Sequence, residues 1–193
     1  MRSHVAALAL LVGCADSFQL AKSYERDHEW ERAYQEWKSV VAERRSPDYS
    51  DAQLAVFHYN FARAAGVTCR WDEAEREFLL AYDLDVRSKG PSDMAMFELG
   101  QLYLDRRDWK TSIQYFDRGF AELARLKGRK TPHAVDLSYV LDEYASALRG
   151  DGRTADADAA LLRANEVRKQ GKLEHKIDRT PYGSQCAPGT SQR

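Results

Sequence analysis

Histidine and carboxylate side chains are the groups of this chain best suited to acid–base or metal chemistry, and their spacing argues against both. The five histidines fall in different segments and share no metal-ligand spacing. Two acidic pairs, Asp72-Glu73 and Asp142-Glu143, are chain neighbours, and neighbours on a helix point in different directions. The sequence also lacks a glycine-rich phosphate loop, a nucleophile elbow and an HExxH motif. We therefore predict no enzyme, no metal site and no cofactor. The histidines are His4, His28, His58, His133 and His175.

The cysteines are the remaining reactive side chains, and the first of the three follows an apolar run. A positive charge at Arg2 precedes about eight apolar residues, Val5 to Val12, far fewer than the roughly 20 that a spanning helix requires. The residues Leu11-Val12-Gly13-Cys14 resemble the lipobox of bacterial lipoproteins, in which a lipid is attached to the cysteine and a signal peptidase cuts just before it. The resemblance covers residues 1–14. It implies that residues 1–13 are a signal peptide and that Cys14 is the lipidated N-terminus.

Lipidation of Cys14 implies a location. Two or more acyl chains hold a protein stably on a membrane. In such lipoproteins an aspartate directly after the cysteine tends to retain the protein in the inner membrane, but here that place is Ala15. The resemblance therefore implies the periplasmic side of the outer membrane. Three alternatives stay open: cleavage after Ala15 to give a soluble periplasmic protein, an apolar helix of a cytosolic solenoid, and a short uncleaved anchor.

The other two cysteines, Cys69 and Cys186, would then lie in a compartment that permits disulfides. We predict that they pair and tie the C-terminal tail back to the middle of the chain. The alternative is two unpaired thiols, one packed in the core and one in the tail.

Composition indicates one globular domain and argues against a nucleic-acid-binding protein. The chain has 29 basic and 30 acidic residues, a net charge of −1. This near-balance argues against nucleic acid as the main partner, and the charges are interspersed as on solvated helix faces. After residue 14 no further apolar run approaches spanning length, and the remaining residues suffice for a sizeable core.

A recurring pattern of small and aromatic residues organises the chain from Leu20 onward. The clearest copy reads Leu99-Gly100-x₂-Tyr103, and Ser112-x₃-Phe116 follows 13 residues after Leu99. The same frame occurs in four units with that separation held constant, and it resembles the tetratricopeptide repeat (TPR). The units begin at Leu20, Phe61, Leu99 and Tyr144, and their second small residues are Ala33, Ala74, Ser112 and Ala157.

The constant separation has a physical reason. Each unit is expected to be a helical hairpin whose small residues sit where the two helix axes approach, because bulk there would push the helices apart. Aromatic side chains at flanking positions, including Trp30, Trp71 and Trp109, fill the gap between hairpins. The units are spaced more widely than the roughly 34 residues of the family, so the second helices and their loops must be longer. Prolines fall after these helices, as the family places them, at Pro47, Pro91 and Pro132.

The sequence thus predicts an all-α, TPR-type right-handed solenoid of four hairpins over residues 14–172. Residues 173–193 are expected to be an extended or partly disordered tail, with a short helix at Leu173–Ile177, unless Cys186 anchors it. Thr131-Pro132 is a good helix start, and Gly171 would stop the last helix. The expected helices are 16–27, 29–45, 51–65, 70–86, 92–106, 108–127, 132–149 and 153–170.

The TPR resemblance also implies a binding surface, because the first helices of the hairpins line a concave face that contacts ligand. Aromatic and methionine anchors with a few polar groups suit an extended or helical peptide. The alternative is that half of these aromatic side chains pack as core. One TPR subfamily grips a C-terminal carboxylate with Lys and Asn; Asn60 and Lys22 fit that pattern, but Met94 and Glu98 do not. The positions implied are Phe18, Lys22, Glu25, Val56, Tyr59, Asn60, Arg63, Met94, Phe97, Glu98, Gln101, Tyr139, Asp142, Glu143 and Ser146.

Together the two resemblances imply an adaptor lipoprotein that binds a protein or peptide segment in its groove and serves assembly of an envelope complex such as a pilus, a secretion channel or a barrel protein. Two other functions stay open. The first alternative is a soluble TPR binding module, and the second is an accessory that recruits an enzyme acting on the cell wall.

Overall fold

The computed structural model describes residues 16–44, 47–126, 134–170 and 179–186, and these contain eight α-helices. They agree with the predicted helices to within about two residues at each end. The predicted signal peptide with Cys14, the helix start at Thr131-Pro132, the stop at Gly171 and the short helix at Leu173–Ile177 lie outside the described residues. The helices are α1 (Ser17–Arg26), α2 (Trp30–Glu43), α3 (Asp51–Val67), α4 (Trp71–Ser88), α5 (Asp93–Asp105), α6 (Trp109–Arg125), α7 (Ala134–Gly150) and α8 (Thr154–Gln170).

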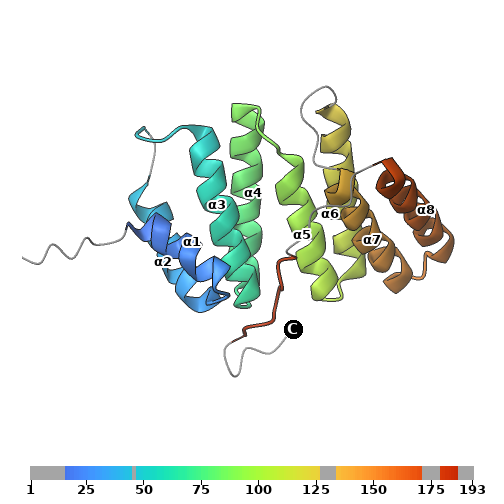
Figure 1. Cartoon of the computed structure of the whole chain (residues 1–193), viewed down its shortest axis with the longest axis horizontal. Helices are drawn as coiled ribbons and strands as arrows, with labels where there is room; N and C mark the ends of the chain where they lie inside the picture. Colours follow the sequence, from blue (N-terminus) through green and yellow to red (C-terminus); the bar gives the residue numbers. More distant parts are fainter. Residues whose placement is uncertain (1–15, 45–46, 127–133, 171–178, 187–193) are drawn as a thin grey trace, which may run out of the picture.

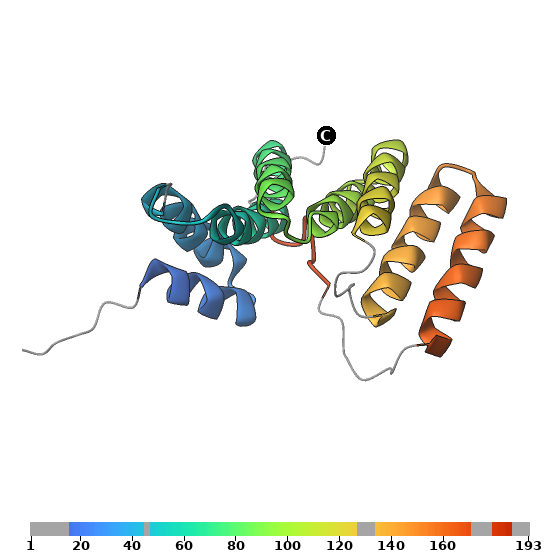
Figure 2. The same ribbon diagram turned by 90° about the horizontal axis from the view of Figure 1, so that it is seen from above.

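The helices form four hairpins that stand side by side in chain order (Figure 1). Each hairpin packs on the next through α2 against α3, α4 against α5 and α6 against α7. Seen from above, the row bends so that α1 and α7 flank the same concave side, with α2, α4 and α6 on the other (Figure 2). The predicted all-α solenoid of four hairpins is confirmed.

The small residues of the repeat frame lie where the two helices of each hairpin meet. All eight are buried, from Ala21 and Ala33 in the first hairpin to Ala145 and Ala157 in the last. A side chain on Gly100 would place its Cβ 2.7 Å from the ring of Phe116. The frame therefore marks real points of close approach.

The turns inside the hairpins repeat as well. His28, Cys69 and Arg107 have φ values of 58°, 65° and 60°, and the equivalent Gly152 has 81°. A left-handed conformation costs a non-glycine residue about 1–2 kcal/mol. Three of the four turns have a non-glycine residue in this conformation. Packing of the two helices must therefore offset the conformational cost.

Tyrosine–carboxylate bonds link successive hairpins. The Tyr34 hydroxyl donates to Glu73 at 2.8 Å, and the Tyr115 hydroxyl donates to Glu75 at 2.6 Å. The two residues of each bond lie 39 and 40 positions apart, close to one repeat. These bonds hold neighbouring hairpins in register.

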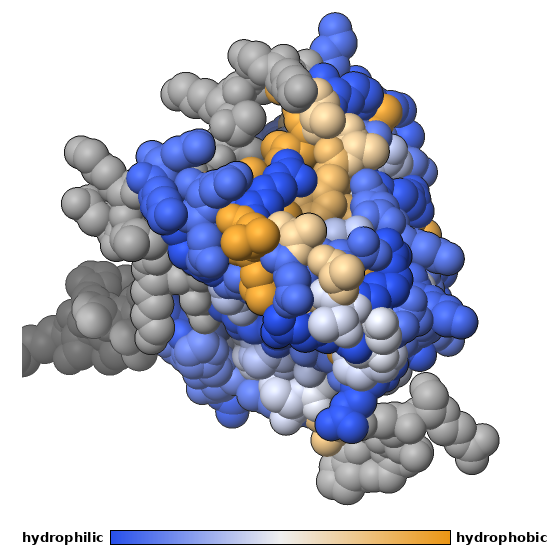
Figure 3. Space-filling model, turned by 90° about the vertical axis from the view of Figure 1, so that its right-hand side faces the viewer, coloured by the Kyte–Doolittle hydropathy of each residue, from blue (hydrophilic) through white to orange (hydrophobic). Residues whose placement is uncertain are grey.

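The α8 end of the solenoid has an apolar strip between hydrophilic regions (Figure 3). Leu162 of α8, the last helix of the row, is 67% exposed. Terminal repeats usually have a polar outer face, so this end departs from the pattern. No helix in the described part of the chain combines the length and apolar character needed to cross a membrane.

Candidate peptide-binding groove

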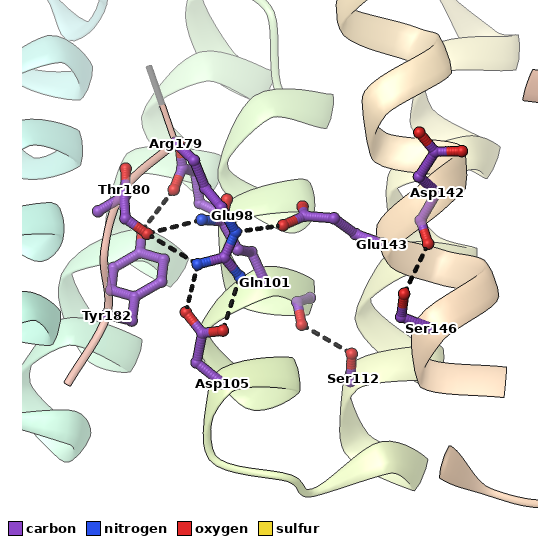
Figure 4. Close-up of polar contacts among 11 residues, drawn as sticks. Glu98, Gln101, Asp105, Ser112, Asp142, Glu143, Ser146, Arg179, Thr180 and Tyr182 are labelled. Carbon is purple, nitrogen blue, oxygen red and sulfur yellow. Dashed lines mark hydrogen bonds and ion pairs between the residues drawn. The ribbon is translucent and has the colours of Figure 1, made fainter. Parts of the chain in front are cut away.

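Residues 179–186 run on the concave side between α3 and α5, and Glu143 of α7 reaches across to Arg179 (Figures 1 and 4). Two main-chain bonds fix the segment to the end of α3: Gly183 N donates to Gly66 O at 3.2 Å and Gln185 N to Val67 O at 3.1 Å. A disulfide joins Cys186 to Cys69 in the turn that follows α3. The groove of this solenoid is therefore partly filled by the chain's own tail.

Arg179 is the charged end of this segment. Its Nη2 and Nη1 donate to the two carboxylate oxygens of Asp105 on α5 at 2.6 and 2.8 Å, while its Nε donates to Glu143 on α7 at 2.7 Å (Figure 4). Such a forked contact suits the planar guanidinium and not a lysine ammonium. Burial raises the pKa of Glu143 to about 7, although the charge of Arg179 opposes that shift.

Thr180 is recognised through both its side chain and its main chain. Arg63 Nε donates to the Thr180 hydroxyl at 2.9 Å, and Gln101 Nε2 donates to the Thr180 carbonyl at 2.7 Å. Thr180 is 3% exposed, so these contacts are shielded from water. α3 and α5 thus hold the same residue from two sides.

Tyr182 is the apolar anchor of the segment and is 6% exposed. Its ring lies on α3 so closely that a Cβ on Gly66 would be 2.6 Å from it. Its hydroxyl donates to Glu98, which also accepts from the Tyr59 hydroxyl at 2.7 Å. Burial and the charge of Glu98 raise the pKa of Tyr182 well above its usual value, so the hydroxyl keeps its proton.

Arg63 is the central cation of the groove. Its Nη1 lies 3.8 Å from Glu25 of α1, and its guanidinium lies 5.7 Å from the ring centre of Trp30. Burial raises the pKa of Glu25, while the charge of Arg63 lowers it. Elements α1, α3 and α5 therefore place charges of both signs beside the tail.

The structure divides the predicted groove residues into three groups. The first group contacts the tail or its direct partners and comprises Glu25, Tyr59, Arg63, Glu98, Gln101 and Glu143. We call the surface that these residues make with Gly66 and Asp105 the covered half. Tyr139 lies near Glu143 and Arg179 at its edge. Burial and the charge of Glu143 raise the pKa of Tyr139 to about 12.

A second group lies on α1, on the first and middle turns of α3 and at the start of α5, away from the tail contacts, and we call it the open half. Lys22 is exposed, Val56 is 51% exposed and Met94 is 37% exposed. Asn60 donates to Val56 O at 2.8 Å, and Phe18 is half-buried against Trp37. The open half comprises Phe18, Lys22, Val56, Asn60 and Met94.

The third group faces elsewhere. The prediction that Phe97 lines the groove is wrong: it is 7% exposed, its ring centre is 5.3 Å from that of Phe120, and Gly119 of α6 leaves room for it. Asp142 accepts a bond from Arg168 of α8, on the side of α7 away from the tail (Figure 4). Ser146 donates to Asp142 O at 3.0 Å.

Sequence reasoning missed Gly66, Asp105 and the tail residues 179–183. The only signal for the tail was Cys186, which follows them closely. In the described ranges, no group of three or more histidine, cysteine or acidic side chains is placed to hold a metal ion.

Comparison with known proteins identifies the fold. No protein-family model matches the chain, and no curated protein sequence matches it. Among solved structures it is similar to BtubC (BKLC) from P. vanneervenii, with a TM-score of 0.70 and 20% identity over 84% of this chain. The fold is a TPR-like helical repeat.

A second solved structure supports this conclusion. A kinesin light chain candidate from Podospora anserina with nearly identical TPR-like repeats aligns with a TM-score of 0.63 and 15% identity, over 80% of this chain and 74% of its own. The present TPR-like chain spans 66% of the length of BtubC, slightly under two thirds. At these identities the likeness concerns the fold alone.

Proposed function

We propose that this TPR-like chain is a non-enzymatic adaptor that binds a segment of a partner protein on its concave face. One observation carries the proposal: the concave face already holds a non-helical polypeptide segment, with a turn at residues 182–185, through main-chain bonds, side-chain bonds and a buried aromatic ring. Main-chain bonds and pockets for particular side chains are the means by which peptide segments are recognised. The face is thus suited to polypeptide.

The open half is the part available to a partner while the tail is in place. Its exposed Val56 and Met94 give apolar area, and Lys22 adds a positive charge at its edge. An apolar centre with polar neighbours is typical of surfaces that bind protein segments. We assign first contact with the partner to this surface.

Lipid on Cys14 would hold the adaptor on the periplasmic side of the outer membrane. The support is the sequence Leu11 to Cys14 together with the position of α1, which begins at Ser17. Three residues span at most about 10 Å, so the first hairpin would lie near the bilayer. That position suits docking to an integral partner during assembly of a pilus, a secretion channel or a barrel protein.

The binding part is tested by crosslinking in cells with a photoreactive residue in place of the exposed Lys22, followed by recovery of the partner. Changing Val56 and Met94 to Asp should abolish recovery of the partner and leave helicity intact. The matched control changes Leu80 and Val86 of α4, which are 39% and 40% exposed outside the groove, to Asp. Equal loss in both variants, or in neither, would overturn the assignment. Phe97 is avoided because it belongs to the core.

The lipid part is tested separately by metabolic labelling with a fatty acid. The unchanged chain should incorporate label and sediment with outer membranes, whereas Cys14→Ser should do neither. Absence of label in the unchanged chain would favour a soluble binding module.

A further inference from the structure

We propose that the covered half is a recognition site for partner segments of the form Arg-(Ser/Thr)-x-Tyr-Gly, and that residues 179–183 occupy it as a resident pseudo-ligand. This inference rests on the adaptor function and states the chemistry of the segment that the groove selects. Each position of the form follows from a contact of the resident segment.

The first position requires arginine. Asp105 and Glu143 converge on it from two helices, and Glu143 is 8% exposed. Without a cation between them the two carboxylates would face each other with little water, which is unfavourable. A guanidinium satisfies both at once because its donors form a planar fork, whereas a lysine ammonium is a single point charge.

The second and fourth positions require hydroxyl groups. Arg63 donates to the hydroxyl at the second position, which a serine supplies as well as Thr180. At the fourth position Glu98 accepts the bond from Tyr182. A phenylalanine there would leave this partly buried carboxylate oxygen without its donor, and such a loss is costly.

The fourth and fifth positions are also selected by shape. Gly66 leaves a bare patch of helix under the Tyr182 ring, although alanine is the better helix former. Gly183 has a φ of 72°, and a Cβ on it would be 2.9 Å from the Trp71 ring. Glycine is the residue that meets both conditions without strain.

The resident segment competes because it is tethered. The bond from Cys186 to Cys69 keeps it close to the groove, which raises its effective concentration. A partner segment should therefore bind weakly to the intact chain and well once the tail is released. Added contacts on the open half would help such a segment to displace the tail.

The experiment uses the full chain carrying Cys186→Ser, Arg179→Ala and Tyr182→Ala, which we call the released variant. The probe is a fluorescent peptide with the sequence of residues 178–185, and anisotropy reports binding. The released variant should bind it saturably, at least tenfold more tightly than the unchanged oxidised chain does. Circular dichroism checks that the released variant keeps its helicity.

Peptide and site variants test the form itself. Peptides with Lys in place of Arg179 or Phe in place of Tyr182 should each bind about tenfold more weakly, the equivalent of about 1.4 kcal/mol. In the released variant, Asp105→Asn should weaken the original peptide and reduce its advantage over the Lys peptide. Gly66→Ala should remove binding, and Leu80→Asp outside the groove should not change it.

The proposal is overturned if the folded released variant does not bind the peptide, or if the Lys and Phe peptides bind as well as the original. Either result leaves the adaptor function standing where partner recovery still depends on Val56 and Met94. Peptide binding without any partner recovery would keep the site and its specificity and remove the proposed adaptor function.

Discussion

The covered and open halves of the groove share helices α3 and α5, yet they differ in chemistry. On α3, Arg63 bonds to the tail, whereas Asn60 bonds to the carbonyl of Val56 in its own helix. The repeat frame places both residues on the concave face in the same way. The difference comes from the tail, which bonds to the polar side chains of the covered half and leaves the open half uncovered.

The covered half is rich in charged side chains, whereas the open half is mainly apolar. The covered half gathers Glu98, Asp105 and Glu143 around two arginines, and much of this cluster is shielded from water. The open half has apolar side chains at Val56 and Met94. Buried charges reject a wrong ligand strongly, because an unpaired charge is costly, whereas apolar contacts discriminate weakly. The covered half is therefore suited to specificity and the open half to general affinity.

Opening the disulfide should give the largest change, because it makes the covered half resemble the open one. We expect Cys69→Ser with Cys186→Ser to lower the free energy of unfolding by about 2–4 kcal/mol, since the bond closes a loop across 117 positions. Urea unfolding without reductant measures this. The unchanged chain in reductant should show the same decrease. An unchanged midpoint in both would mean that the bond does not constrain the unfolded chain.

Removing the cation from the covered half should have the next largest effect. Arg179→Ala leaves Glu143 and Asp105 without their partner and should cost about 2 kcal/mol, a value reduced because Arg179 is partly exposed. Adding Glu143→Gln should restore part of the loss, because the amide carries no charge. Arg149→Ala is the control, since its exposed pair with Asp158 should contribute less than about 0.5 kcal/mol. Equal costs for Arg149 and Arg179 would contradict the distinction.

The fold could be predicted from the sequence because its determinants recur within single units. Small residues at a constant offset, such as Ala62 and Ala74, identify each hairpin without knowledge of distant contacts. The fate of Phe97 depends instead on Gly119 in the next helix, whose missing side chain provides the space that the ring fills. A frame gives a position on a helix, but the neighbouring helix decides whether the side chain there is core or surface.

The covered half was harder to predict because its contacts join distant residues without periodicity. Arg179 meets Asp105 and Glu143 from 74 and 36 positions away. Local spacing carries no information on such pairs, and the tail has no helical pattern. Glu98 and Glu143 were placed on the concave face by the frame, but their role follows only once the tail is seen beside them.

Lowering the pH should weaken docking of the tail on Glu143, although protonation of Glu143 favours folding of the chain as a whole. Relative to the unfolded chain, its pKa is raised from 4.5 to about 7, so this group's contribution to folding is fully present below about 4.5 and is lost as pH rises through about 7. Docking of Arg179 acts in the opposite direction. Because Arg179 lowers the pKa of Glu143, docking releases a proton, and its stabilising effect is lost as pH falls through about 7.

The two effects separate in the Cys186→Ser chain. Amide exchange of Gly183 and Gln185, corrected for intrinsic rates, should be faster at pH 6 than at pH 8, and Glu143→Gln should remove this difference. The other groups that face Glu143 are Glu98 and Asp105 of α5, Tyr139 of α7 and Arg179 of the tail. A dependence on pH that persists in Glu143→Gln would assign the titration to one of these groups.

Substitutions in the open half should change stability least, and this sets the lower end of the comparison. Val56 and Met94 are exposed, so Val56→Ser and Met94→Ser should each alter the free energy of unfolding by less than about 0.5 kcal/mol. The same variants should leave amide exchange at Gly183 unchanged, because neither residue supports the tail. Urea unfolding together with exchange at Gly183 tests both points. If either variant released the tail, the two halves would be one coupled surface, and a partner binding to Val56 and Met94 would itself displace residues 179–183.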